Sequence, residues 1–302
     1  MKSRRFLPAV VSLLAMAAAG SGHLNAQAIQ RALYVSVVDD KGVPVKDLTP
    51  TDVIVREDNV AREVLRVAPA TEPMQIALLI DTSSASRDNI SFFRSALPSF
   101  VTALTNPNDA GRKNEVAIIA FGERPTIITD YTTNVGELQK GINRLWSLPD
   151  TGAYLLDALL EVTKGFKVRE AKRPVIVAIT QEGTELSYRH YDQVVGPLRD
   201  SGAALYALML GTPTGDISEE ARSRNLAVEE GTRTTGGYRE QLLTPMGLAS
   251  GLKTLADRLT HQFVVTYGRP QSLIPPERVT VSAAKPGMVA RGTLIKDAQG
   301  RP

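Results

Sequence analysis

Four apolar runs mark the middle of the chain, and stretches with helical spacing separate them. A strand that is buried on both faces is apolar along its whole length, and strands that alternate with helices form a mostly parallel sheet. The pattern therefore predicts an α/β fold over residues 71–260, with a doubly wound, mostly parallel, Rossmann-like sheet between two layers of helices. The expected strands are 76–80, 116–121, 175–179 and 203–210, and the expected helices are 89–104, 135–145, 153–166, 190–200 and 246–260.

The two ends of the chain have a different pattern, with short strand-like segments separated by turns. Segments 33–38, 53–55 and 64–67 fall in the N-terminal part, residues 29–70, and 263–267, 279–281 and 288–295 fall in the C-terminal part, residues 261–302. The breaker Ala68-Pro69-Ala70 separates the first part from the α/β pattern. We expect the two ends to pair into one small β domain beside the α/β domain.

Residues 1–28 have the features of a secretory signal peptide. Lys2, Arg4 and Arg5 precede an uncharged run over 6–19, and Ala26-Gln27-Ala28 offers a cleavage site. We therefore expect an exported protein, periplasmic or extracellular, that meets the membrane only through its transient signal peptide. Both the general secretory and the twin-arginine routes stay open.

Composition limits the chemistry and the partners. None of the 302 residues is cysteine, so disulfides, thiol nucleophiles and thiolate metal sites are excluded. Three of the 35 basic residues and none of the 32 acidic ones lie in residues 1–28, so the rest of the chain carries equal numbers of each. A balanced charge gives no indication of nucleic-acid binding.

The first apolar run ends in Asp81-Thr82-Ser83-Ser84-Ala85-Ser86. In doubly wound sheets, ligands bind beyond the carboxyl ends of the strands. Over residues 75–260 the chain resembles the von Willebrand factor A (VWA) family, and as a whole it looks like the VWA-related secreted proteins of soil bacteria. In that family an Asp and two Ser of a D-x-S-x-S loop, a Thr from a second loop and an Asp from a third hold a divalent cation in an adhesion site.

The resemblance implies these loops but not all of these ligands. Asp81 and Ser83 match the family pattern, whereas Ala85, Ala153 and Gln181 stand where the pattern has serine, threonine and aspartate. Mg²⁺ and Ca²⁺ need several hard oxygen ligands, so we expect no metal or other cofactor and a vestigial site in which Asp81 and Ser83 cap the following helix. Rescue of a Mg²⁺ or Ca²⁺ site by neighbouring oxygens is the alternative. The loop residues in question are Asp81, Ser83, Ser84, Ala85, Ser86, Thr151, Ala153, Gln181 and Glu182.

Catalytic patterns are weak. Asp150-Thr151-Gly152-Ala153 matches the aspartic protease sequence but does not follow an apolar strand, and only His190 and His261 remain as histidines after residue 28. We expect an exported, non-enzymatic, protein-binding or adhesion-type module whose partner is a protein or another envelope macromolecule. The alternatives are metal-dependent adhesion through a rearranged site and, third, a hydrolase. A contact surface without metal is suggested by aromatic residues in the segments around these loops, namely Tyr131, Trp146, Tyr154, Tyr188 and Tyr191.

Overall fold

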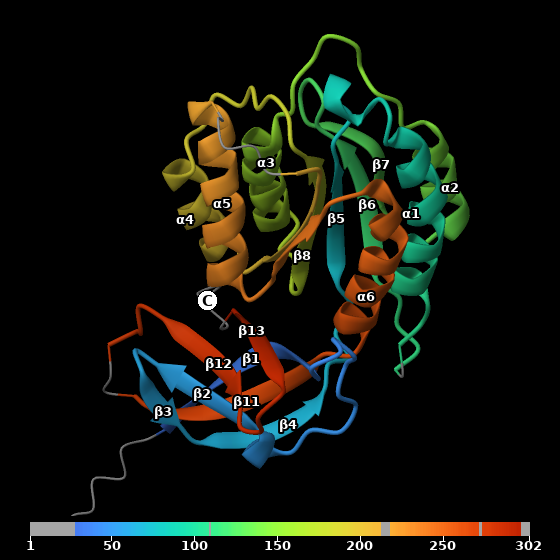
Figure 1. Cartoon of the computed structure of the whole chain (residues 1–302). Helices are drawn as coiled ribbons and strands as arrows, with labels where there is room; N and C mark the ends of the chain where they lie inside the picture. Colours follow the sequence, from blue (N-terminus) through green and yellow to red (C-terminus); the bar gives the residue numbers. More distant parts are fainter. Residues whose placement is uncertain (1–27, 109, 213–217, 272–273, 297–302) are drawn as a thin grey trace, which may run out of the picture.

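A computed structural model describes residues 28–108, 110–212, 218–271 and 274–296. The expected signal peptide therefore lies outside the described residues, apart from Ala28. Within them, no helix combines the length and the apolar character that crossing a membrane requires. Figure 1 shows an upper α/β domain and a lower domain made of strands.

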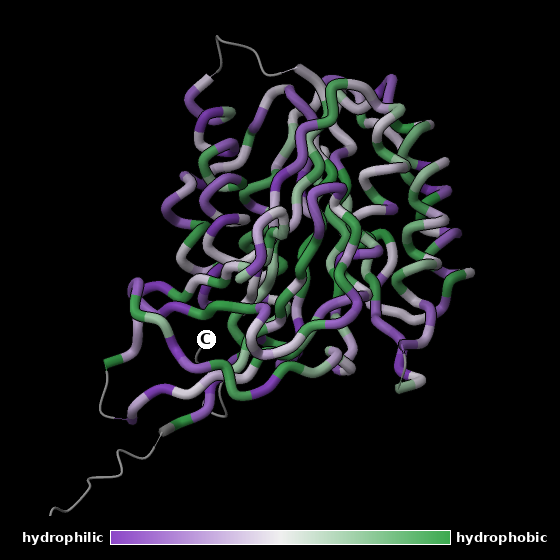
Figure 2. The backbone as a smooth tube through the Cα atoms, turned by 60° about the horizontal axis from the view of Figure 1, so that its bottom comes forward, coloured by the Kyte–Doolittle hydropathy of each residue, from purple (hydrophilic) through white to green (hydrophobic). Residues whose placement is uncertain are grey.

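The upper domain is built on a six-stranded sheet in the order β10-β9-β8-β5-β6-β7, parallel except for β7, which pairs antiparallel with β6. The expected mixed α/β fold with a mostly parallel sheet is thus confirmed. The central strands carry almost no polar side chains because both of their faces are covered, and Figure 2 shows these hydrophobic strands between helices of mixed character. The strands are β5 (Gln75–Ile80), β6 (Glu115–Ala120), β7 (Thr126–Thr132), β8 (Pro174–Gln181), β9 (Ala204–Leu210) and β10 (Arg239–Leu242).

Helices cover both faces of this sheet. Helices α1 (Ile90–Thr105), α2 (Val135–Asn143) and α6 (Leu248–Thr260) lie on one face, and α3 (Leu155–Val168), α4 (Asp192–Asp200) and α5 (Glu219–Thr235) lie on the other (Figure 1). On α1, the residues Phe93, Leu97, Phe100, Val101 and Leu104 are buried, and this spacing of three and four forms one apolar stripe against the sheet.

The lower domain joins the two ends of the chain. Strand β1 (Ala28–Val38) pairs antiparallel with β11 (Phe263–Pro270) and β13 (Val289–Leu294), and β4 (Val64–Pro69) completes this four-stranded sheet. A second sheet contains β2 (Val53–Glu57), β3 (Val60–Arg62) and β12 (Val279–Ala283). The ends pair as expected into one small β domain, which consists of two sheets around a shared apolar core. The reason is that β2 and β12 pair with each other and face β1 and β11 across buried valines.

The segment Thr235–Gly237 at the end of α5 connects the two domains. The Thr293 hydroxyl donates to the Thr235 carbonyl at 2.7 Å, and Arg291 Nη1 donates to the Gly237 carbonyl at 3.1 Å. Gly236 has a φ of +82°, and a Cβ there would lie 2.0 Å from the Gly292 carbonyl oxygen. The close approach of the two backbones therefore requires glycine at this position.

Candidate functional site

The loop after β5 turns the first candidate residue inward. Asp81 is 1% exposed, its Oδ1 accepts a hydrogen bond from the Ser83 amide at 2.9 Å, and the Thr180 hydroxyl donates to its Oδ2 at 3.4 Å. Burial raises the pKa of Asp81. The expected capping role is wrong, because α1 starts only at Ile90, and neither Ser83 nor Asn89 makes a side-chain cap. Asp81 instead binds the amide two residues ahead, which fixes the loop itself.

A short 3₁₀ turn, η2 (Ser84–Ser86), follows the first loop. Hydrogen bonds join this turn to the second loop, which contains Thr151 and Ala153. The Ser84 hydroxyl donates to the Thr151 carbonyl at 2.6 Å, and the Ser147 hydroxyl donates to the Ser83 carbonyl at 2.8 Å. The Leu148 amide donates to the Thr82 carbonyl, also at 2.8 Å. The first and second loops are therefore joined by direct hydrogen bonds.

The third loop begins at Gln181, the last residue of β8, and the side chain of Gln181 contacts the first loop. The Gln181 Oε1 atom accepts from Asn89 Nδ2 at 2.6 Å. In the opposite amide orientation, its nitrogen donates to the Ala85 carbonyl at 3.3 Å and its oxygen accepts from the Ser86 amide at 2.9 Å. In both orientations this side chain, which is 4% exposed, ties β8 to the η2–α1 segment. An aspartate in the family pattern would meet a cation at this point, whereas Gln181 meets the neighbouring loop itself.

The second and third loops are joined at Ala153. Its amide donates to the Thr184 carbonyl at 2.8 Å, and the Leu186 amide donates to the Ala153 carbonyl at 2.7 Å. The Ala153 methyl group is buried in the apolar core, 2% exposed, and supplies no oxygen.

Glu185, paired with Ala153 in an isolated bridge, is a residue that the sequence analysis missed. Its side chain is 1% exposed, and both carboxylate oxygens are buried. Burial raises the pKa of Glu185 to about 7, against the opposing influences of hydrogen bonds from Ser187 and of the Arg224 charge. The loop therefore contains a carboxyl group that changes charge near neutral pH.

Arg224 on α5 is the second residue that the sequence analysis missed, and it is completely buried. Its Nη1 donates to the carbonyls of Gln181 at 3.2 Å and Gly183 at 3.0 Å, and its Nη2 lies 3.0 Å from Glu182 Oε2. The guanidinium also donates to the Asn225 side chain at 3.1 and 3.2 Å. Its charge acts on Asp81 and Glu185 as well. A side-chain cation therefore already holds the third loop and offsets its carboxylates.

The side chains of these loops offer a divalent cation few oxygen ligands. Asp81 is the one carboxylate of the expected ligand set, and Ala85 and Ala153 supply no side-chain oxygen at two of its other positions. The neighbouring oxygens that could replace the lost ligands have other partners: Ser84 and Ser86 donate to carbonyls, Thr151 donates to Leu148, and Glu182 pairs with Arg224.

The aromatic residues of these segments divide into two groups. Trp146 and Tyr188 are 67% and 90% exposed, and Leu186 beside Tyr188 is 42% exposed. Tyr131, in contrast, packs on Phe166 with a ring distance of 6.1 Å, Tyr191 packs on His190 at 4.7 Å, and Tyr154 is half-buried at the start of α3. The exposed apolar surface of this face therefore comes from Trp146, Leu186 and Tyr188.

The comparisons with known proteins agree with this fold. Residues 76–183 match the model of the von Willebrand factor type A domain, while no curated protein matches the sequence. A von Willebrand factor type A structure from Catenulispora acidiphila has a TM-score of 0.51 at 10% identity and covers 89% of this chain and 72% of its own. Proximal thread matrix protein 1 from the mussel byssus has a TM-score of 0.50 at 16% identity.

The mussel match covers 71% of this chain, and this chain spans half the length of the mussel protein. The vWF domain of the type V pili tip protein Mfa5 from Porphyromonas gingivalis is similar at 10% identity and a TM-score of 0.47, over 63% of this chain and 96% of its own. At these identities the structures show a shared fold. Residues 76–183 of the α/β domain therefore match the von Willebrand factor type A domain family in sequence, and the two structures with TM-scores of 0.50 and 0.51 agree with that fold.

Proposed function

We propose that this protein is an exported, non-enzymatic binding module that engages a protein or another envelope macromolecule without a divalent cation. Its binding face is the carboxyl-end edge of the β5–β8 sheet, formed by the three loops described above. The observation that carries the proposal is the set of direct contacts between these loops through Ser84, Ala153 and Gln181. In addition, Arg224 holds the third loop to α5, so no bridging cation is needed to position it.

The exposed apolar residues of this face support binding to a macromolecule. Trp146 and Tyr188 are large side chains with a polar atom at one end, and such residues dominate the energetics of protein interfaces. VWA domains in general mediate protein interactions, and the mussel protein of similar fold is a thread matrix protein. A rigid loop framework lowers the entropy cost of binding, because less has to be ordered in the complex.

One observation favours the alternative, adhesion through a rearranged metal site. The Glu185 carboxylate is buried, and it belongs to the loop joined to Ala153. The nearby positive charge of Arg224 opposes a second cation there. For this reason we propose the metal-independent mode and keep the alternative as an outcome of the test.

The test is capture of partners from the native envelope fraction by the immobilised protein, with chelator and with added Mg²⁺. We expect the same specific partner in both buffers, and a loss of capture in Trp146→Ala and Tyr188→Ala. Ile274→Ala, at an 86% exposed site in the β domain, is the matched control and should capture normally. Capture that needs Mg²⁺ would support the alternative, and capture unaffected by both aromatic changes would contradict the proposed face.

A further inference from the structure

A pocket opens beside Trp146 on the proposed binding face, and we call it the Trp146 pocket. It has a volume of about 100 Å³ and lies between the first loop, the carboxyl end of β6, the start of β7 and the segment that leads into the second loop. Thr82, Gly122, Thr126 and Leu148 contribute to its lining, one from each of these parts. The pocket therefore shares residues with the loop framework of the proposed face.

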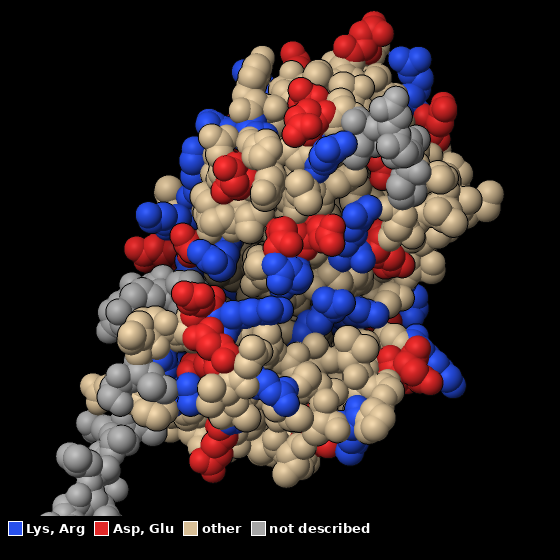
Figure 3. Space-filling model, turned by 60° about the vertical axis from the view of Figure 1, so that its left-hand side comes forward, with Lys and Arg blue, Asp and Glu red and all other residues tan. Residues whose placement is uncertain are grey.

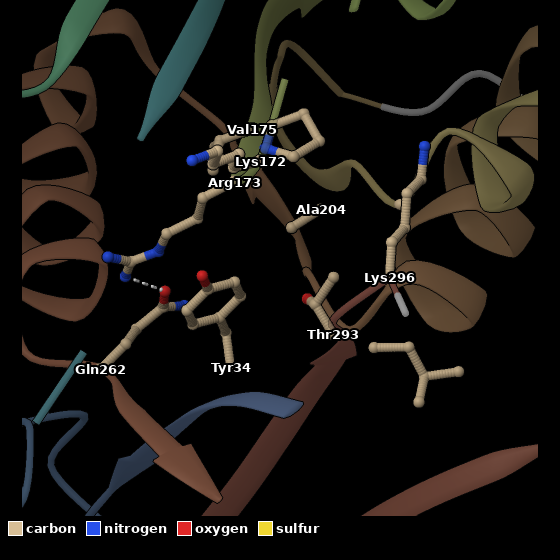
Figure 4. A pocket seen from close by; sticks show the side chains of 11 residues that line it. Tyr34, Lys172, Arg173, Val175, Ala204, Gln262, Thr293 and Lys296 are labelled. Carbon is tan, nitrogen blue, oxygen red and sulfur yellow. Dashed lines mark hydrogen bonds between the residues drawn. The ribbon is translucent and has the colours of Figure 1, made fainter. Parts of the chain in front are cut away.

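The spaces at the opposite end of the sheet have a different character. Between the two domains, a hollow of about 10 Å³, room for one water molecule, lies among Tyr34, Arg173 and Thr293. Figure 4 shows Tyr34 and Thr293 between Arg173 and Lys296, so the buried arginine does not reach the lysine. The larger groove beside this hollow is lined by lysines, and basic side chains form a band between the upper and lower domains in Figure 3. Neither space includes a residue of the proposed face, whereas the Trp146 pocket does.

Apolar side chains form much of the wall of the Trp146 pocket. Ala120 and Leu145 are 8% and 1% exposed, and Ile128 is partly buried against the core of the sheet. The Trp146 side chain, in contrast, is 67% exposed, although it borders the same space. An apolar group that enters the pocket would therefore remove the indole as well as itself from water.

Several polar groups of the lining already have partners within the protein. The Gly122 amide donates to Thr82 Oγ1 at 3.1 Å, and the Leu148 amide donates to the Thr82 carbonyl at 2.8 Å. The Arg144 guanidinium donates to the Ile128 carbonyl. A C-terminal carboxylate is typically captured by free backbone amides, and the amides of Gly122 and Leu148 are engaged. The pocket therefore favours a side chain from within a chain segment over a chain end.

Three charged residues border the pocket, and all of them are exposed: Glu123, Arg124 and Arg144. Among the described residues none of the three forms an ion pair, so two arginines stand against one glutamate at this border. A carboxylate next to the apolar group would offset the excess of positive charge. The charges therefore favour a partner segment with an acidic residue beside the apolar one.

We propose that the Trp146 pocket binds a leucine-sized side chain of a protein partner, with an acidic residue of the same segment beside Arg124 and Arg144. This inference rests on the proposed function, because it names the part of the partner that the binding face holds. The volume sets the size of the side chain. An enclosed apolar cavity of about 150 Å³ takes a benzene ring, so the smaller Trp146 pocket fits a branched aliphatic side chain better than an aromatic one.

Trp146 is the single tryptophan of the chain, so tryptophan fluorescence reports on this pocket. The test titrates the full-length protein with N-acetyl-glutamyl-leucinamide and follows the emission of Trp146. We expect a saturable shift to shorter wavelength, because the ring loses contact with water, with a Kd of roughly 1–10 mM. N-acetyl-glutamyl-glycinamide, which lacks the aliphatic side chain, should give no shift. N-acetyl-glutaminyl-leucinamide, which lacks the charge, should bind roughly threefold more weakly, as expected for the loss of an exposed ion pair.

Two variants of β7 provide a blocked pocket and its matched control. Thr126→Phe places a ring at the pocket from an exposed strand position, where aromatic residues are favoured, so this variant should fold. It should weaken binding of N-acetyl-glutamyl-leucinamide by about tenfold or more, because the ring occupies the space of the leucine side chain. Ile127→Phe adds the same ring one residue further, on the opposite face of the strand and at a 60% exposed site outside the pocket, and should bind normally.

Absence of a saturable shift with N-acetyl-glutamyl-leucinamide would overturn the proposal. An equal shift with the glycinamide probe, or equal weakening by Thr126→Phe and Ile127→Phe, would also overturn it, because binding would then not depend on a side chain in the pocket. Equal binding of the glutamyl and glutaminyl probes would overturn the acidic neighbour. Capture of a partner that Trp146→Ala abolishes, in a protein that binds no probe, would leave the proposed function standing and refute the pocket alone.

Discussion

Arg224 of α5 and Glu182 of the third loop form a buried ion pair, with 3.0 Å between Nη2 and Oε2. The arginine side chain has no exposed surface, and that of the glutamate is 12% exposed. The same guanidinium binds two carbonyls of this loop, so α5 and the loop are fixed relative to each other. The shape of the proposed binding face therefore depends on a residue that does not reach its surface.

Arg224→Met keeps an unbranched apolar stem but removes the charge and the donors. Because Glu182 and two carbonyls then lose their partner in a buried place, we expect the free energy of unfolding to fall by about 3–5 kcal/mol. Urea denaturation measures it. Arg222→Met, at an exposed position of the same helix, should change stability by less than about 0.5 kcal/mol. Similar losses in both variants would show that the ion pair does not organise the loop.

The raised pKa of Glu185 predicts that the free energy of unfolding depends on pH. The folded-state pKa of about 7 lies above the ordinary value of 4.5, so between these pH values the folded protein keeps a proton that the unfolded chain has lost. The contribution is fully present below about pH 4.5 and is lost as the pH rises through 7, by roughly 3 kcal/mol in total. Burial raises the pKa of Asp81 too, so its contribution has the same sign.

The measurement is the urea midpoint of the native protein and of Glu185→Gln from pH 5 to pH 8. The variant should have a flatter profile than the native protein, because its side chain does not titrate. A native profile that rises over this range, or an equal slope in both proteins, would contradict the assignment of a buried, protonated Glu185.

Gly237 tests the packing of the turn after α5 against strand β9. A Cβ at this position would lie 1.7 Å from the Leu205 carbonyl oxygen, and backbone cannot move aside easily. We expect Gly237→Ala to lower the free energy of unfolding by about 3 kcal/mol. Gly165→Ala in α3, where nothing lies within 4 Å of the new methyl group, should instead stabilise the protein by up to about 1 kcal/mol. Thermal melting of the two variants compares them directly, and equal effects would contradict the close contact.

The sequence predicted the sheet and the helices well because buried parallel strands are apolar throughout. Between helical segments, short apolar runs such as 76–80 and 175–179 are typical of buried strands. The two sheets of the lower domain were not predicted, because short alternating strands do not indicate which partner they choose.

The candidate site was only partly predictable. The loop positions of Asp81, Ala153 and Gln181 follow from the strand order, but the inward turn of Asp81 depends on local hydrogen bonds. Arg224 lies in a polar segment, yet Ala221, Ala227 and Val228 place it on the buried face of a helix at spacings of three and four. That periodicity was the available signal for Arg224, whereas a single acidic residue in a loop, such as Glu185, gives none.

A second test restores the metal ligands of the family pattern. The triple change Ala85→Ser, Ala153→Thr and Gln181→Asp adds three oxygen ligands to Asp81 and Ser83. If the loops keep the family geometry, this variant should melt at a higher temperature in Mg²⁺ than in chelator. Failure to gain any shift would indicate that the direct contacts and Arg224 have changed the geometry of the loops.

The most direct measurement is the melting temperature of the unmodified protein with chelator and with millimolar Mg²⁺, Ca²⁺ or Mn²⁺. A ligand present at about 100 times its Kd stabilises the native state by roughly 2.7 kcal/mol, which a melting curve resolves easily. Since Gln181 already joins the first and third loops and Arg224 fixes the third loop to α5, we predict the same melting temperature in every buffer. A clear increase with a divalent cation that Asp81→Ala abolishes would contradict the metal-independent account.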